Sequence, residues 1–134
     1  MVRTVAVDLD GCLARYSGEW RGPAHIGEPL PGAVEAMAAL VEMAFHVVVF
    51  TCRIELNEKW VDGLPREELI RIVEDWLRDN AFPAEMSVWT EGGKPMAEYY
   101  LDDRAIHVEP QRDPDAWEWA LHIIQLGELQ RATQ

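Results

Sequence analysis

Two aspartates, Asp8 and Asp10, follow a short valine-rich segment and precede a glycine. The apolar residues 5–7 predict a buried strand that breaks into a loop at the acids. Residues two apart in an extended segment share a face, so both carboxylates can reach one point while Leu9 turns toward the core. Gly11 permits a sharp backbone turn there. Two solvated acids at the edge of a turn fit this short stretch equally well, and the later segments decide between these interpretations.

Polar groups also follow the later apolar runs. They are Thr51 and Arg53 after residues 46–50, Lys94 after residues 86–89, and Asp102 and Asp103 after residues 99–101. Ligands of parallel α/β sheets bind at the carboxyl ends of the strands, so we expect these groups to gather at one edge. Carboxylates in one crevice repel one another unless a cation neutralises them. All-oxygen ligands, without His or Cys, predict Mg²⁺ shared with a substrate phosphate.

Such a set of groups suits phosphoryl transfer. Lys94 supplies a positive charge and Thr51 a hydroxyl donor for phosphoryl oxygens, and this reaction depends mainly on positioning and charge neutralisation. One carboxylate can act as nucleophile and the other, two residues on, as proton donor, in a two-step hydrolysis through an aspartyl-phosphate. Arg53 lies next to this group and can reach a substrate, although an arginine on a loop is commonly just solvated.

Alternating strands and helices must position these groups. Periodicity predicts strands over residues 4–8, 46–50, 86–89, 99–101 and 105–108, and helices over residues 32–44, 65–80 and 114–129. This order predicts an α/β protein with a three-layer α/β/α Rossmann-like fold and a mostly parallel sheet. At 134 residues the chain has a typical single-domain length, so we expect residues 1–134 to form one domain.

Two segments have open interpretations. Residues 12–31 contain three Gly and three Pro, which predicts a short flap or loop. Its Tyr16, Trp20 and His25 can contact a substrate, but an ordered loop that packs its own aromatic residues explains them as well. In residues 114–129 the apolar positions are spread too widely for one narrow stripe, which fits a homo-oligomer or partner surface as well as a covered terminal helix.

Composition limits the classes of partner and compartment. Acidic residues outnumber Lys and Arg by 24 to 12, for a net charge of −12, which weighs against binding of long nucleic acid. Cys12 and Cys52 have neither zinc-site spacing nor a disulfide framework, which fits a reducing compartment. The chain enters its first strand without room for a signal peptide, and no apolar run approaches the length of a membrane span. We therefore expect a cytoplasmic protein that does not bind membranes.

Four motifs in order resemble those of the haloacid dehalogenase (HAD) superfamily of phosphatases. They are Asp-Leu-Asp-Gly after the first strand, Val-Val-Val-Phe-Thr after the second, Lys94-Pro95, and Leu101-Asp102-Asp103, and the match spans residues 4–108. The resemblance implies a Mg²⁺-dependent phosphomonoester hydrolase. It also implies that Asp8 is the nucleophile and Asp10 the general acid and then the general base.

The resemblance assigns the binding residues as well. It implies that Thr51 and Lys94 hold the phosphate, and that Asp8, Asp102 and the backbone carbonyl of Asp10 bind the metal. The resemblance also implies that Asp103 orients the metal shell or an inner lysine. Cys12 departs from the pattern, because the family more often has Thr or Val at its position.

The chain also lacks room for a cap domain at the two places where family members often carry one. The resemblance therefore implies a capless enzyme with an open crevice, which suits a bulky phosphorylated substrate or closure by a partner subunit. A second class of protein, a non-catalytic phosphate- or metal-binding module on the same fold, stays open because fold does not settle function. A signalling receiver domain fits poorly, since receivers carry adjacent acids after the first strand and here they follow the fourth.

Overall fold

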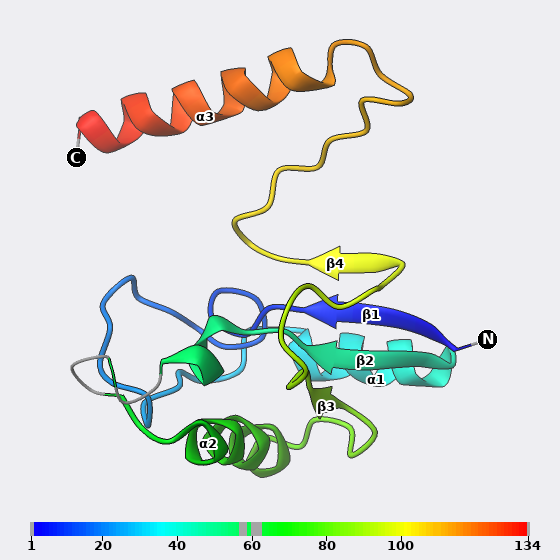
Figure 1. Cartoon of the computed structure of the whole chain (residues 1–134), viewed down its shortest axis with the longest axis vertical. Helices are drawn as coiled ribbons and strands as arrows, with labels where there is room; N and C mark the ends of the chain where they lie inside the picture. Colours follow the sequence, from blue (N-terminus) through cyan, green and yellow to red (C-terminus); the bar gives the residue numbers. More distant parts are fainter. Residues whose placement is uncertain (1, 57–58, 60–62, 134) are drawn as a thin grey trace. The chain divides into compact units, whose positions relative to one another are not determined.

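The computed structural model describes residues 2–56, 59 and 63–133, which divide into two compact units, Met1–Asp103 and Arg104–Gln134. Each unit is described by itself. In chain order the elements are β1 (Arg3–Val7), α1 (Ala33–Glu42), β2 (Phe45–Val49), the short 3₁₀ helix η1 (Cys52–Glu55), α2 (Arg66–Asp79), β3 (Ser87–Val88), β4 (Tyr99–Leu101) and α3 (Ala116–Ala132) (Figure 1). The first unit holds all the strands, and the second is built around α3.

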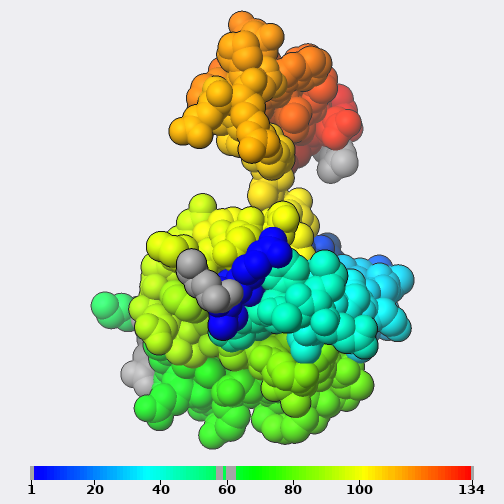
Figure 2. Space-filling model, turned by 90° about the vertical axis from the view of Figure 1, so that its right-hand side faces the viewer, coloured from blue at the N-terminus to red at the C-terminus, as the bar shows by residue number. Residues whose placement is uncertain are grey.

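The first unit contains a four-stranded sheet in the order β3-β2-β1-β4, and every pair in it is parallel. Val7 at the end of β1 is level with Val49 of β2 and Leu101 of β4. The carboxyl ends of these strands therefore meet at one edge of the sheet, as predicted. The opposite end of β1 reaches the surface beside α1 (Figure 2). The expected α/β fold with a parallel sheet is confirmed.

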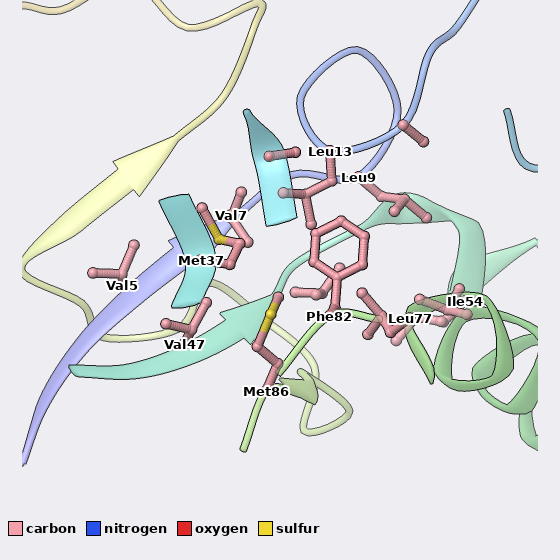
Figure 3. Packing of buried hydrophobic residues seen from close by; sticks show 14 of the residues in the cluster. Val5, Val7, Leu9, Leu13, Met37, Val47, Ile54, Leu77, Phe82 and Met86 are labelled. Carbon is pink, nitrogen blue, oxygen red and sulfur yellow. The ribbon is translucent and has the colours of Figure 1, made fainter. Parts of the chain in front are cut away.

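The core of the first unit joins one face of the sheet to both of its helices. Alternate residues of β1 and β2, such as Val5, Val7 and Val47, are buried with Met37 of α1 and with the buried face of α2. These side chains point toward one another, with the ring of Phe82 among them (Figure 3). Packing of this apolar face holds β1 and β2 rigidly in register, which positions the loops that follow them.

The predicted elements differ from the observed ones at several places. Residues 105–108 were expected to add a strand but have irregular backbone, and they belong to the second unit, whereas all four strands of the sheet belong to the first. The last helix begins at Ala116. Just before it, the side chain of Asp113 accepts a hydrogen bond of 2.9 Å from the amide of Asp115. Two expectations stay predictions because α3 belongs to the second unit. They are the second helical layer of the three-layer α/β/α fold and the single domain over residues 1–134. In the described part of the chain, no helix is both long and apolar enough to cross a bilayer.

Candidate active site

The loop after β1 places Asp8 at the carboxyl edge of the sheet. The amide of Asp8 donates to the carbonyl oxygen of Leu101 over 2.9 Å, so the residue lies level with the end of β4. Its own carboxylate accepts a hydrogen bond of 2.8 Å from the amide of Leu9 through Oδ1. Leu9 itself is fully buried, so the alternation expected for this stretch is present. The backbone thus holds one oxygen of a half-buried carboxylate in place.

Asp8 meets two other side chains at this edge. Ligand atoms of Asp8, Cys12 and Asp103 all lie within 4.8 Å of one another. Burial raises the pKa of Asp8 to about 6, and the negative charges of Asp102 and Asp103 add to the increase, partly offset by the amide of Leu9. The ionised form of Asp8 is therefore disfavoured, first by burial and then by the neighbouring acids.

Cys12 is a member of this cluster that motif-based reasoning missed. The turn over residues 9–14 returns it to the end of β1, since the amides of Leu13 and Ala14 both donate to the carbonyl oxygen of Leu9. Burial and the nearby charges of Asp8 and Asp103 raise the pKa of the Cys12 thiol to about 11. Its position four residues after the first acid was visible in the sequence, but the closeness of Asp103 was not.

Gly11 is required by the approach of Asp103. Its φ is +84°, in the left-handed region, and a Cβ on this residue would overlap the carboxylate of Asp103. A glycine thus allows the acid that follows β4 to approach the loop that follows β1. The predicted role of Gly11 in a sharp turn is confirmed, and the close contact gives it a second role.

The end of β2 supplies a buried hydroxyl group. Thr51 is 4% exposed, and its Oγ1 accepts a hydrogen bond of 3.2 Å from the amide of Arg53 as the N-cap of η1. The hydrogen of that hydroxyl is thereby left to donate to another acceptor. Burial, followed by the charges of Asp8 and Asp10, raises the pKa of Cys52, so this strand end lies within electrostatic reach of both acids.

Arg53 turns inward instead of toward solvent. It is 3% exposed, and its Nε and Nη2 donate to the two carboxylate oxygens of Asp10 at 2.7 and 2.9 Å. Nη1 donates to the carbonyl oxygen of Pro23 at 3.1 Å, and Nη2 also donates to that of His25 at 2.8 Å. The guanidinium carbon lies 4.8 Å from the ring centroid of Trp20. Of the three flap residues considered from the sequence, Trp20 and His25 thus contact Arg53.

Other predicted residues are placed less centrally. Lys94 is exposed, and its Nζ lies 4.4 Å from the ring centroid of Tyr100 instead of forming an ion pair with the acids of the described residues. Asp102 is exposed and acts on Asp8 through its charge. Tyr16 is partly exposed in the flap. The described structure therefore brings Asp8 and Asp103 together directly, while Lys94 lies on the segment between β3 and β4.

The donor set at the edge of the sheet fits a hard divalent cation. Carboxylate oxygens of Asp8 and Asp103 approach one another, and such oxygens are the ligands that a hard divalent cation prefers. The thiol of Cys12 keeps its proton at neutral pH, because its pKa is about 11, and is therefore a poor ligand for Mg²⁺. Chemically, the arrangement offers a carboxylate nucleophile, a second carboxylate two residues away and a buried hydroxyl donor.

Comparisons with known proteins show no family for this chain. A scan against protein-family models found no match, and neither did a search of curated proteins. Among solved structures, the chain is similar to a conserved protein of Bacteroides thetaiotaomicron, with 20% sequence identity, a TM-score of 0.48 and 79% of each chain covered. Similarity at this level carries no argument about activity, so the α/β assignment rests on the parallel sheet itself.

Proposed function

We propose that this protein is a Mg²⁺-dependent phosphomonoester hydrolase of the HAD type, which works through an aspartyl-phosphate on Asp8. One observation carries the proposal: a half-buried carboxylate at the end of β1 lies against Asp103, the acid that follows β4. Burial, together with the neighbouring charges of Asp102 and Asp103, raises the pKa of Asp8 to about 6, and perturbed carboxylates of this kind are typical of functional sites. The order of the four motifs supports the same reaction.

In the proposed reaction, Asp8 attacks the phosphorus atom of the monoester. A bond forms between a carboxylate oxygen and phosphorus as the ester oxygen leaves, and Asp10 gives that oxygen a proton. In the second step Asp10 takes a proton from water while the water oxygen attacks phosphorus. Inorganic phosphate leaves and the Asp8 carboxylate is restored.

Residues around the nucleophile hold the charged groups. Asp8, Asp103, Asp102 and the backbone carbonyl of Asp10 would hold Mg²⁺, which supplies charge neutralisation for the transferring phosphoryl group. Thr51 donates its hydroxyl to a phosphoryl oxygen, and Lys94 provides an exposed positive charge from the segment before β4. Arg53, considered from the sequence as a phosphate ligand, is better explained by its contacts with Asp10 and the flap.

The proposed substrate is a phosphorylated molecule that is bulky enough to need no cap, and the proposed location is the cytoplasm. Net charge of −12 makes long nucleic acid an unfavourable substrate. The exposed apolar residues of α3 suit self-association into a homo-oligomer.

A second candidate is a non-catalytic phosphate- or metal-binding module on the same fold. It is favoured by one observation, that Arg53 engages both carboxylate oxygens of Asp10. A carboxylate held in this way suits a static binding site as well as a proton-transfer step. The two candidates differ in turnover, because only the hydrolase would release phosphate from a phosphomonoester.

Phosphate release from a broad panel of phosphomonoesters tests the proposal. We expect release by wild type with Mg²⁺ and none in chelator, and a loss of more than about 10³-fold in Asp8→Asn. The matched control is Asp79→Asn at the exposed end of α2, which should retain wild-type rates. Absence of turnover on the whole panel, or an Asp8→Asn variant as active as wild type, would exclude the enzyme and leave the binding module.

A further inference from the structure

Arg53 is an unusual residue in a chain in which the other ion pairs of the described residues involve exposed side chains. Its guanidinium is almost completely buried, and every nitrogen of it donates a hydrogen bond. Buried arginines of this kind are costly to desolvate, so their contacts must be well satisfied. The contacts of Arg53 lead to two parts of the molecule: Asp10 and the flap segment of residues 20–25.

The contact with Asp10 fixes the direction of a carboxylate. Two parallel hydrogen bonds, Nε to Oδ2 at 2.7 Å and Nη2 to Oδ1 at 2.9 Å, remove rotation of the carboxylate about its last bond. Each carboxylate oxygen has a second lone pair, so a site for a proton or a water molecule is still available. Arginine is suited to this role because lysine, a point charge, cannot form such a fork.

The contacts with the flap use the remaining donors. Carbonyl oxygens of Pro23 and His25 accept from Nη1 and Nη2, and the ring of Trp20 lies against the guanidinium group. These groups are not charged, so they order the segment without competing for the ion pair. The backbone amide of Arg53 also donates to the hydroxyl oxygen of Thr51. One residue thus connects the end of β2, the acid after β1 and the flap.

We propose that Arg53 is a positioning residue, which orients the Asp10 carboxylate for proton transfer and anchors flap residues 20–25 to the same carboxylate. The inference rests on the proposed phosphatase function. It extends that function by making proton transfer dependent on a residue outside the four motifs. Arg53 does not touch the phosphoryl group in this scheme.

The dependence on the leaving group separates positioning from a general structural role. Aryl phosphates such as p-nitrophenyl phosphate release a stable anion that hardly needs a proton, whereas alkyl phosphates release a basic alkoxide that does. We expect Arg53→Lys to lower kcat/KM for an alkyl phosphate by about 10²-fold and for p-nitrophenyl phosphate by less than about 3-fold. Asp10→Asn should show the same selectivity, and the double variant should be no worse than Asp10→Asn alone.

A matched control is Arg15→Lys, which alters an exposed flap arginine that pairs with Glu28 at 3.0 Å. It should leave both substrates unchanged. Thermal unfolding of each variant establishes that it is folded at the assay temperature. Equal losses on both substrates, or additive losses in the double variant, would overturn the inference while the phosphatase function stands. A wild type that hydrolyses neither substrate would overturn both.

Amide hydrogen exchange provides a reading that does not depend on activity or on Arg53 variants. The amide of His25 donates to the carbonyl oxygen of Gly22 within the flap. If Arg53 links the flap to Asp10, Asp10→Asn should increase exchange at His25 by about 5-fold or more, because it weakens the ion pair that holds the guanidinium. Unchanged exchange in Asp10→Asn would show that the flap is held independently and would refute the anchoring role.

Discussion

Asp8→Asn should stabilise the protein in metal-free buffer, and by more at alkaline than at acidic pH. The pKa of Asp8 is raised from 3.8 to about 6 in the folded chain, chiefly by burial. A raised folded-state pKa means that this group's favourable contribution is fully present below the unfolded value and is lost as the pH rises through about 6. Asparagine keeps an Oδ1 acceptor for the amide of Leu9 and carries no charge, so it avoids that loss.

The magnitude follows from the two pKa values. A difference between 3.8 and about 6 corresponds to about 3 kcal/mol at pH 8. Since the Asp8 side chain is only half-buried, solvent screening reduces this to about 1.5 kcal/mol. At pH 4.5 most of the folded chain already carries a protonated Asp8, so the gain from the variant falls to about 0.5 kcal/mol.

Urea unfolding followed by circular dichroism, in chelator at pH 4.5 and 8, measures both values. Asp79→Asn serves as the control, because this exposed residue should change the free energy of unfolding by less than about 0.5 kcal/mol at either pH. An Asp8→Asn variant that is less stable than wild type at pH 8 would refute the reasoning. So would a gain that is equal at the two pH values, since it would show that charge on Asp8 is not the cause.

Two further predictions concern the site and the core. Gly11→Ala should destabilise the fold by about 1–3 kcal/mol and weaken Mg²⁺ binding, because the alanine adds left-handed strain and a Cβ that overlaps Asp103. A thermal melt measures the loss of stability, and calorimetric titration with Mg²⁺ measures the loss of binding. Unaltered Mg²⁺ binding would contradict the close approach of Asp103 to Gly11. Leu69→Ala should cost about 3 kcal/mol in urea unfolding, since Leu69 is 2% exposed in the core and its removal leaves a cavity; a loss below about 1 kcal/mol would show that the core collapses around it.

Local pattern was sufficient to predict much of the fold. The valine-rich runs and the helical periodicities predicted β1, β2, α1 and α2 to within a few residues, because alternation and amphipathic spacing are properties of neighbouring positions. The parallel sheet followed from the order of strands and helices. The expected strand over residues 105–108 was wrong, since a short apolar run does not determine whether it pairs with a sheet edge.

The site divides in the same way. Sequence by itself determined that Asp8 and Asp10 follow a buried strand and that Thr51 follows the next, since strand ends are local features. Only the tertiary structure decided that Asp103 and Cys12 meet Asp8, and that Arg53 turns inward to Asp10. The contacts of Asp103 with Asp8 and of Arg53 with Asp10 join residues far apart in the chain, and that of Cys12 depends on how the loop after β1 turns back. Strand register and loop closure set their geometry, and no short stretch of sequence specifies either.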